Sequence, residues 1–263
     1  MGKLPQDFKT PKKKLRVLLL ADHLHPASTV REQIYAIKKL SFYNVSLVNP
    51  IVIKNPKLFK KLSYDIILIH YSIYVLSDYY LSIKWLSFLK NDSSLNCQII
   101  QDEYRNINDF KESFNDLAIK AVFSSLDSKE NLKKVYNRKP YTEALFFSSL
   151  PGYISAEMRS RKPSKIKDRA VDIVYRGREL PAELGLMAQE KKSISQLFKK
   201  LAIKKNLIVD LETSESNRIY GKEWTKFLMS GKTMLAVSGG ASIFDFDGNL
   251  YRRTNEYRIN NPD

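Results

Sequence analysis

LRVLLLADHLHPASTVREQIYAIKKL, residues 15–40, joins an apolar run to a stretch with helical spacing. Residues 15–21 are apolar enough for a strand that is buried on both faces of a sheet. Thr29 and Glu32 have the spacing of a capping box, which marks the start of a helix. Apolar residues then recur at helical intervals, at Val30, Ile34, Ile37 and Leu40. The sequence therefore predicts a buried strand followed by an amphipathic helix.

Similar apolar runs alternate with amphipathic stretches further along the chain. They predict strands at residues 44–48, 65–70, 97–101, 121–125 and 144–147. Helices are expected where Leu81, Trp85, Leu86 and Leu89 share one face, and again at residues 129–136. Alternating strands and helices are typical of a parallel sheet covered on both faces. We therefore expect an α/β fold, with a Rossmann-like domain over residues 15–155.

A second alternation follows a polar segment. Residues 156–170 are basic, contain Pro163 and lack apolar periodicity, so they predict a linker. Strands are expected at 172–176, 207–212 and 233–238, with amphipathic helices between them. Residues 251–263 are too few for the remaining strands and helices of a doubly wound domain. We therefore expect residues 171–263 to form a second Rossmann-like domain that is incomplete.

The composition is that of a globular protein. The chain has 263 residues, 43% of them hydrophobic, which is enough for two modest cores. Its longest apolar run, residues 64–76, is shorter than the roughly 20 residues of a membrane-spanning helix. The start of the chain lacks the apolar stretch of a secretory signal, so we expect a cytoplasmic protein. The single cysteine, Cys97, lies in an apolar run and is interpreted as a small buried hydrophobe.

Basic residues exceed acidic ones by 44 to 28, which gives a net charge of +16. Such an excess favours anionic partners. The basic clusters in residues 1–14 and 156–170 are interpreted as a solvated tail and linker, and peripheral contact with the inner face of an anionic membrane is the alternative. Nucleic acid is not expected as a partner, because most of the 15 tyrosines and 13 phenylalanines fall inside apolar runs rather than on a basic face.

All three histidines follow predicted strands. His23 and His25 come after the first strand, and His70 ends the third. Ligands of parallel sheets bind beyond the carboxyl ends of the strands, and histidine accepts protons near neutral pH. Each histidine is therefore a candidate base that deprotonates an acceptor hydroxyl. The alternative for each is a residue that caps a strand or holds a loop.

Two further strand ends carry charge. Gln101, Asp102, Glu103, Tyr104 and Arg105 place two carboxylates and a guanidinium together, as binders of sugar hydroxyls or as an ordinary charged loop. In the second domain, Arg176 and Arg178 flank Gly177, and arginine side chains match phosphate oxygens. These two arginines favour an anionic nucleotide. A pair that braces the linker through surface salt bridges is the alternative.

Two short matches to known motifs are rejected. Residues 230–233, SGKT, resemble the end of a P-loop, but the position of the earlier glycine holds Lys226 and the lysine precedes a predicted strand. Residues 245–248, DFDG, resemble metal-binding or phosphatase carboxylates. In those phosphatases the motif follows the first strand of the catalytic domain, whereas here little chain follows it. No metal site is predicted.

The chain resembles bacterial GT-B glycosyltransferases of the family 1 type that assemble surface polysaccharides. The matching stretches are HYS at His70, QDEYR at Gln101, YRGRELP at Tyr175, Glu190 with Lys191, RIYGKEW at Arg218 and GASIFDFDG at Gly240. The resemblance covers most of the chain from Leu15. It implies two Rossmann-like domains that face a cleft, the first binding a glycan or lipid-linked acceptor and the second binding a UDP- or GDP-linked sugar donor.

The resemblance also implies roles for individual residues. Arg176, Arg178 and Lys191 would neutralise the donor diphosphate, and the backbone of Gly239, Gly240, Ala241 and Ser242 would approach the donor. No metal ion or other cofactor is expected. The chain departs from the family at Ser238, where an acidic residue is usual, and the family continues past the last residue here. The alternative is thus a catalytically inactive, truncated glycosyltransferase that binds nucleotide or glycan.

Overall fold

The computed structural model describes residues 14–150, 152–154, 156–238 and 240–262. Their contacts divide the chain into two compact units. The first unit comprises the chain up to Gln101 together with Asp109–Tyr153. The second unit comprises Asp102–Asn108 and Ile154–Asp263. Residues 102–108, which the sequence places in the first domain, thus pack within the second unit.

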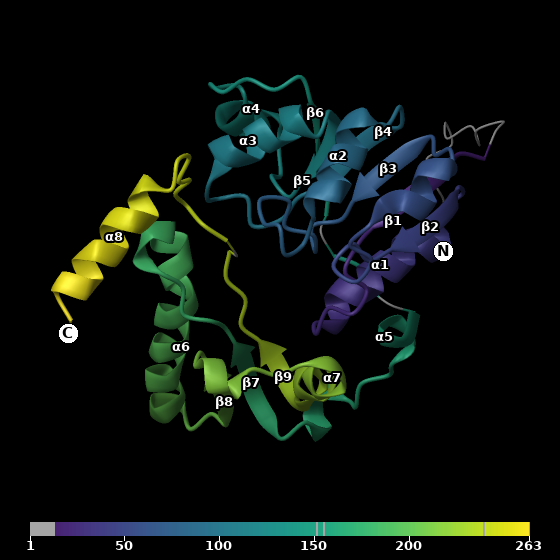
Figure 1. Ribbon diagram of the computed structural model, residues 1–263. Coiled ribbons are helices and arrows are strands. Elements are labelled where there is room, and N and C mark those ends of the chain that lie inside the picture. Colours follow the sequence, from purple (N-terminus) through teal and green to yellow (C-terminus); the bar gives the residue numbers. More distant parts are fainter. Residues whose placement is uncertain (1–13, 151, 155, 239, 263) are drawn as a thin grey trace. The chain divides into compact units, whose positions relative to one another are not determined.

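A six-stranded sheet of parallel strands forms the centre of the first unit, in the order β2-β1-β3-β4-β5-β6 (Figure 1). The strands are β1 (Arg16–Leu20), β2 (Asn44–Val48), β3 (Ile66–Ile69), β4 (Leu95–Ile99), β5 (Ile119–Ser124) and β6 (Leu145–Ser148). Strand and helix alternate along the chain, so the unit has an α/β fold consistent with a Rossmann-like domain. Because β2 and β3 flank β1 on opposite sides, the strand order reverses between β1 and β3.

The helices of the first unit are α1 (Ser28–Leu40), α2 (Ile83–Asn91), α3 (Ile107–Asp116) and α4 (Lys129–Tyr136), with the short 3₁₀ segment η1 (Pro56–Lys61). The first two residues of α3 are counted with the second unit. Two of these helices differ from the sequence prediction. The capping box at Thr29 is wrong, because α1 begins at Ser28, its N-cap is Ala27 and no side chain caps it. Helix α3 was not predicted, because its apolar residues lie between many polar ones.

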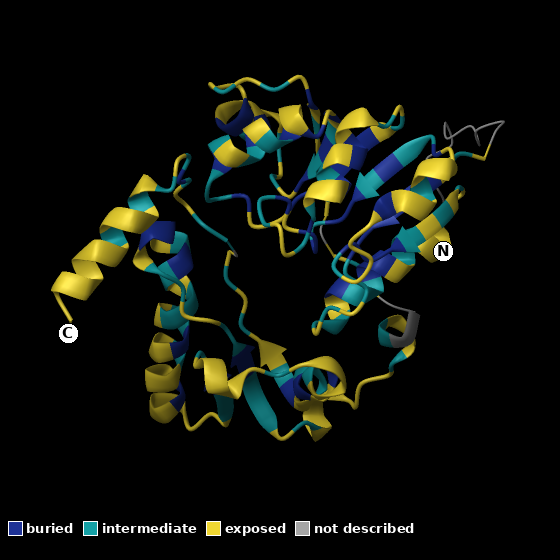
Figure 2. Ribbon diagram, in the orientation of Figure 1, coloured by how far each residue is buried: buried dark blue, intermediate teal, exposed yellow. Residues whose placement is uncertain are grey.

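The core of the first unit lies between the sheet and its helices. Leu19 and Ala21 of the first strand region pack with Val30 and Ile34 of α1. Trp85 of α2 is fully buried, and strands, helices and loops all contribute further buried apolar residues (Figure 2). The unbroken apolar run of β1 is therefore explained by burial on both faces of the sheet. Cys97 is buried as expected, and burial raises the pKa of its thiol to about 11.

The second unit has a smaller parallel sheet of three strands in the order β8-β7-β9. The strands are β7 (Val171–Arg176), β8 (Val209–Glu212) and β9 (Gly231–Met234). Its longer helices are α6 (Leu186–Lys205), α7 (Gly221–Ser230) and α8 (Asn249–Asn260), and its 3₁₀ segments include η3 (Ala182–Leu184) and η4 (Glu215–Asn217). As in the first unit, the first strand of the sheet has a neighbour on each side, so the strand order reverses between β7 and β9.

Three parts of the second unit differ from the prediction. The predicted linker contains the short helix α5 (Ala156–Ser160) and the 3₁₀ segment η2 (Ile166–Asp168). Strand β9 begins and ends earlier than the predicted strand at 233–238, as β4 does in the first unit relative to 97–101. Helix α8 was not predicted, since none of its residues is buried (Figure 2). No helix in the described part of the chain is long and apolar enough to cross a membrane.

Candidate functional site

A pocket of about 380 Å³ opens where β7 and β9 end in the second unit. This is the point at which the strand order reverses, where open parallel sheets usually bind their ligands. Its lining comes from the end of β7, from α6, from the segment that leads into α7, and from the end of β9. The lining residues are Tyr175, Arg176, Gly177, Arg178, Lys191, Asn217, Arg218, Ile219, Tyr220, Trp224, Met234, Leu235, Ala236 and Val237.

Cations line the pocket, and no carboxylate does. Arg178 is exposed, Lys191 is half-buried on α6, and neither forms an ion pair with any residue that the structure describes. Arg218 pairs with the exposed Glu215 at 2.5 Å and lies over the ring of Tyr220. This exposed ion pair contributes little stability, so Arg218 can exchange its partner for another anion. The pocket therefore offers three cations to a negatively charged ligand.

Arg176 lines the same pocket but is held by the protein. Its Nη1 lies 2.7 Å from a carboxylate oxygen of Asp210 and donates to the carbonyls of Tyr175 and Asp210. Its guanidinium carbon lies 4.4 Å from the centre of the Phe227 ring. The structure thus brings Arg176, Arg178 and Lys191 together as the sequence predicts. Arg176 thus connects β7 to β8 and α7, and none of these contacts among the described residues involves the predicted linker.

Two aromatic side chains and a helix end complete the pocket. Tyr220 is the N-cap residue of α7, and no side chain caps that helix, so its first backbone N–H groups have no side-chain acceptor. Trp224 lies one turn into α7 and stacks on Phe227 with ring centres 5.6 Å apart. Helix N-termini favour anions, and aromatic faces favour planar bases. A ligand that carries both a phosphate and a base would match this arrangement.

Gly177 lines the pocket at the end of β7 and lies close to the Tyr175 side chain. A Cβ at this position would lie 2.5 Å from the hydroxyl of Tyr175, whose ring is buried. That hydroxyl donates to the carbonyl of Lys191 at 3.0 Å and ties β7 to α6. Burial also raises the pKa of Tyr175, with the charge of Glu190 as the second cause. Only glycine fits beside Tyr175 in this arrangement.

The described part of the predicted donor loop, residues 240–242, lies outside this pocket. Gly239 lies outside the described residues, and Gly240, Ala241 and Ser242 do not line the pocket. The Ser242 amide donates to the carbonyl of Leu184 at 2.9 Å, and its hydroxyl accepts from the amide of Met187 at 3.4 Å. A Cβ on Gly185, whose φ is +83°, would lie 2.3 Å from the Ser242 hydroxyl. Ser242 therefore helps to hold the start of α6.

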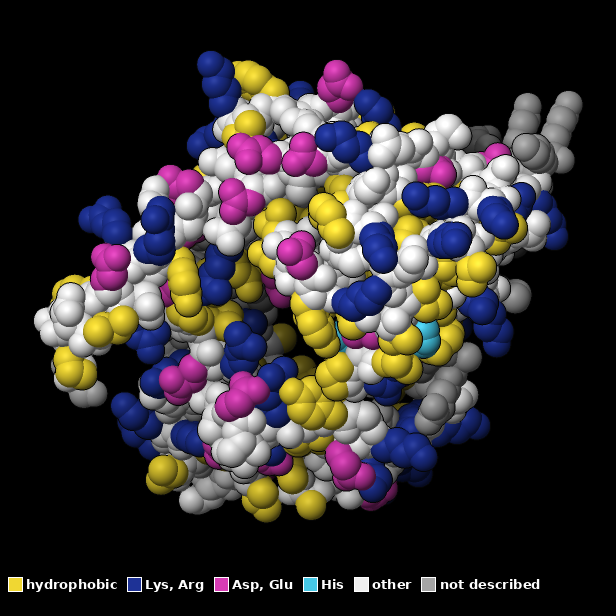
Figure 3. All heavy atoms as spheres, in the orientation of Figure 1, with side chains coloured by type: hydrophobic (Ala, Val, Ile, Leu, Met, Phe, Trp, Pro, Cys, Tyr) yellow, Lys and Arg dark blue, Asp and Glu magenta, His cyan; other side chains and the backbone are white. Residues whose placement is uncertain are grey.

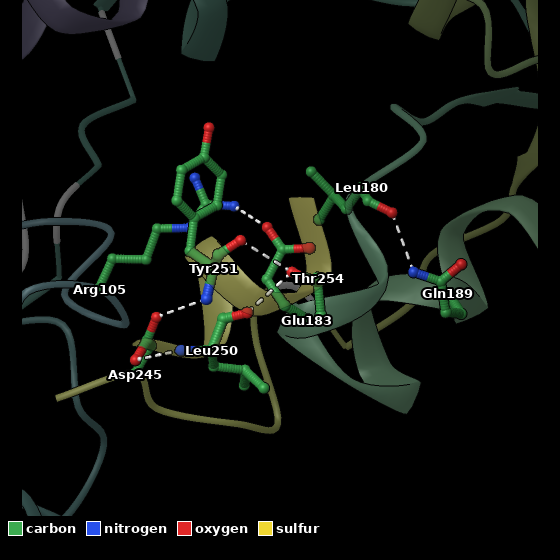
Figure 4. Close-up of polar contacts among 8 residues, drawn as sticks. All are labelled: Arg105, Leu180, Glu183, Gln189, Asp245, Leu250, Tyr251 and Thr254. Carbon is green, nitrogen blue, oxygen red and sulfur yellow. Dashed lines mark hydrogen bonds and ion pairs between the residues drawn. The ribbon is translucent and has the colours of Figure 1, made fainter. Parts of the chain in front are cut away.

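The five residues predicted to bind an acceptor differ in burial and in the unit with which they pack. Gln101 is exposed in the first unit, whereas the other four belong to the second unit. Glu103 is buried, and Asp102 is exposed with a φ of 57°. Arg105 donates at 2.6 Å to Glu183, whose side chain is only 3% exposed (Figure 4). Burial raises the pKa of Tyr104, and the charge of Asp102 raises it further.

Arg105 and Asp245 belong to one structural cluster. Figure 4 shows the Arg105 side chain beside Tyr251 of α8, and its guanidinium carbon lies 4.9 Å from that ring centre. The two carboxylate oxygens of Asp245 accept from the amides of Leu250 and Tyr251, at 3.2 and 2.9 Å. The amide of Asp245 donates to the carbonyl of Tyr104 at 2.8 Å. The DFDG stretch therefore caps α8 and ties it to residues 104–105.

His70 is placed differently from the other two histidines. It is fully buried, its Nδ1 accepts from the amide of Ser72 at 3.1 Å, and its Nε2 lies 2.9 Å from Gln33 Oε1. Because Nδ1 accepts from an amide, Nε2 carries the proton and donates to Gln33. Burial lowers the pKa of His70 to about 3, and His25 lowers it further. With both nitrogens occupied and no exposed surface, His70 is a neutral structural residue and is not retained as a base.

His23 and His25 lie in the loop after β1, at the strand-order reversal of the first unit. The Nδ1 of His25 accepts from the Ala27 amide at 3.1 Å, and His25 is half-buried. The Nδ1 of His23 is buried and has no hydrogen-bond partner among the described residues. Asp22 shapes this loop, because its carboxylate accepts from the Leu24 amide and the Asn49 side chain. His23 and His25 thus each keep a ring nitrogen without a described partner, Nδ1 in His23 and Nε2 in His25.

Sequence reasoning missed several residues of the pocket, and three of them carry charge or aromatic rings that bear on a ligand. Arg218, Tyr220 and Trp224 join it because η4 and the start of α7 lie near the end of β7. Their only signal was the RIYGKEW stretch, to which no individual roles were assigned. Among the described residues, no group of three His, Cys, Asp or Glu side chains could hold a metal ion.

We compared the chain with protein-family models, curated proteins and solved structures, and none of these comparisons found a match.

Proposed function

We propose that this protein is a GT-B-type glycosyltransferase of cell-surface polysaccharide assembly. It would transfer a sugar from a UDP- or GDP-linked donor to a glycan or lipid-linked acceptor. One observation carries the proposal: the pocket at the end of β7 combines three cations that can bind an anion with two aromatic rings and lacks carboxylates. A nucleotide diphosphate has the complementary chemistry, since it carries a planar base and negative charge at opposite ends.

The donor would be held through its leaving group. Arg178, Lys191 and Arg218 would bind the diphosphate oxygens, and the first amides of α7 would add hydrogen bonds. As the bond between the anomeric carbon and the diphosphate oxygen breaks, negative charge grows on the diphosphate. Fixed cations at that position stabilise the transition state. In this proposal the protein supplies that charge itself, and no metal ion is required.

The acceptor hydroxyl needs a base, and the first unit supplies a candidate. His25 keeps Nε2 free of described partners at the carboxyl end of β1. The acceptor oxygen would bond to the anomeric carbon while its proton passes to the imidazole. His23 is the second candidate, because its buried Nδ1 has no described partner. This assignment rests on the GT-B resemblance, in which the first domain binds the acceptor.

Isothermal titration of the full chain with UDP, GDP and their sugar conjugates tests the proposal. We expect selective binding of one nucleotide class, and about 30-fold weaker binding in Arg178→Ala, because a charge-assisted hydrogen bond contributes about 2 kcal/mol. Lys192→Ala is the matched control, since Lys192 is a neighbouring cation that pairs with Glu179 and does not line the pocket.

Each outcome of the titration is informative. Equal weakening by both substitutions would show that binding follows net charge, and would contradict the assigned pocket. No binding at millimolar nucleotide by the folded chain would contradict the proposal as well. Binding that is lost in Arg178→Ala, without transfer to any glycan or lipid-linked acceptor, would favour the alternative of a catalytically inactive nucleotide-binding protein.

A further inference from the structure

A surface of the first unit combines exposed aliphatic side chains with lysines. We call it the basic-apolar patch and define it as residues 51–63 and 79–87, which include η1 and the start of α2. Both segments follow strands at the carboxyl edge of the sheet, after β2 and β3. Figure 3 shows lysine and arginine side chains interleaved with apolar ones over the part of the first unit that holds β1, β2 and β3. The proposed donor pocket contains none of these residues.

Hydrogen bonds and ring stacking join the two segments of the patch to each other. The fully buried Trp85 donates from Nε1 to the carbonyl of Ile53 at 2.6 Å and stacks on Phe59 with ring centres 5.7 Å apart. The Ser82 hydroxyl donates to the carbonyl of Lys54 at 2.7 Å. Loop 51–55, η1 and α2 are thus held as one surface, which can present its outer side chains together.

Several of the outer side chains on these segments are both apolar and highly exposed. Leu58, Ile83 and Val52 are 75%, 72% and 62% exposed. Tyr79, Ile53 and Leu62 of the same segments are also exposed. Single exposed apolar residues are ordinary, but a group on fastened neighbouring segments marks an interaction surface. Among these exposed apolar residues aliphatic side chains predominate, which does not match the stacking faces that nucleic acid requires.

The charge of the patch has one sign. Its two segments contain Lys54, Lys57, Lys60, Lys61 and Lys84, and they contain no Asp or Glu. Lys57, Lys60 and Lys84 line a pocket of about 410 Å³ with Pro56 and Ile83. None of these three lysines forms an ion pair with a residue of the described chain. The pocket therefore leaves room for anionic groups beside an aliphatic wall.

We propose that the basic-apolar patch docks the first unit on an anionic phospholipid surface. Aliphatic side chains such as Leu58 and Ile83 would enter the boundary between headgroups and acyl chains, and the lysines would bind the phosphates. Electrostatic attraction of lysines to anionic lipid and burial of apolar side chains both strengthen binding to a membrane surface. A surface that combines lysines with exposed aliphatic side chains can use both. This inference goes beyond the proposed sugar transfer and does not depend on it, because docking requires no nucleotide.

Co-sedimentation with vesicles tests the inference. The full chain is mixed with vesicles of phosphatidylcholine alone or of phosphatidylcholine with phosphatidylglycerol. We expect binding to the second kind only. Each lysine near an anionic leaflet contributes about fivefold to partitioning, so Lys57→Glu/Lys60→Glu/Lys84→Glu should weaken binding about 100-fold or more. Leu58→Ser/Ile83→Ser should weaken binding as well, although it leaves the charge unchanged.

The matched control reverses three exposed lysines on and beside α4. Lys129→Glu/Lys133→Glu/Lys139→Glu changes the net charge equally at residues outside the patch and without described ion pairs. We expect it to weaken vesicle binding much less than the patch variant. Equal weakening by the two triple variants, or unchanged binding of Leu58→Ser/Ile83→Ser, would overturn the proposal. Absence of binding to anionic vesicles by the unmodified chain would also overturn it. Circular dichroism establishes that each variant is folded.

Discussion

The buried imidazole of His70 makes stability depend on pH. Its pKa is lowered from 6.5 to about 3 because burial disfavours the charged ring. In the unfolded chain the ring regains its ordinary pKa and binds a proton as the pH falls below about 6.5. The unfolded state then binds more protons than the folded state. Stability from this group is therefore complete above about pH 6.5 and is lost as the pH falls.

We expect the change from pH 7 to about pH 5 to cost about 2 kcal/mol through His70, since each pH unit below 6.5 costs about 1.4 kcal/mol. The free energy of unfolding is measured with urea at both pH values, for the unmodified protein and for His70→Gln. The difference between their pH dependences isolates the contribution of His70, because the other titrating groups are common to both proteins. The NMR signals of the His70 ring should also remain those of a neutral imidazole at pH 5. An identical pH dependence in His70→Gln, or a ring that titrates near pH 6.5, would contradict this account.

The sequence predicted which candidate residues lie at strand ends, but it did not predict their burial or their hydrogen-bond and ion-pair partners. Each of the three histidines ends or follows an apolar run in the sequence. In the structure His70 differs from His25 because it is fully buried. The hydrogen-bond partners of the buried His70 ring, Gln33 and Ser72, come from α1 and the loop after β3. No local pattern contains that information. The arginine at position 176 is a parallel case, because its partner Asp210 lies in a different strand.

At the scale of elements, the Arg105–Glu183 pair joins residues 102–108 to η3 of the second unit. Glu183 is buried at 3% exposure, and Arg105 also lies over Tyr251 of α8. Removal of Arg105 would leave a buried carboxylate without its partner, which costs about 3 kcal/mol. We therefore expect Arg105→Ala to destabilise the protein by about that amount, as measured by urea unfolding at neutral pH.

The exposed pair Lys192–Glu179 provides the comparison, with side chains 45% and 53% exposed. Lys192→Ala should cost less than about 1 kcal/mol. Arg105→Ala should in addition increase hydrogen exchange at the α8 amides, because α8 packs on η3 and contacts Arg105 through Tyr251. Equal costs for the two substitutions would show that the Arg105–Glu183 pair has no special role.

Most strands could be predicted from the sequence, because the apolar run that marks a strand is contained in a short stretch of residues. A strand buried on both faces requires an apolar run, and β1 is the clearest example. The predicted runs also coincide closely with β2, β3, β5 and β7, although polar residues interrupt the runs of β2, β5 and β7. Helix α8 was missed because it has no apolar stripe; its start is held by the Asp245 carboxylate and by contact with η3. The capping box at Thr29 failed for the opposite reason, since a local pattern was present and the structure does not use it.

At the scale of the whole molecule, the cations behind the net charge of +16 occur in two different kinds of surroundings. Arg178, Lys191 and Arg218 surround a pocket, whereas the lysines of the basic-apolar patch stand beside exposed aliphatic side chains. The first arrangement fits a small anion with a base, and the second fits an anionic surface. Charge counts alone cannot separate the two uses, because both depend on lysine or arginine side chains.

The α/β fold and the parallel sheets follow from the alternation of apolar runs, and the structure confirms them. The position of the pocket could also be predicted from the carboxyl-end rule, which selected Arg176 and Arg178. Arg218, Tyr220 and Trp224 could not, because they precede or begin a helix and no strand end marks them. The GT-B assignment and the donor remain proposals that depend on this pocket.

Trp224 allows the central claim to be tested at the site itself. The chain has two tryptophans, and Trp85 is buried in the other unit while Trp224 lines the pocket. We predict that UDP or GDP, or its sugar conjugate, quenches the fluorescence of the unmodified protein. Trp224→Phe should show no quenching, because Trp85 alone would remain. Quenching that persists in Trp224→Phe, or no quenching at millimolar nucleotide, would contradict a nucleotide site in the pocket at the end of β7.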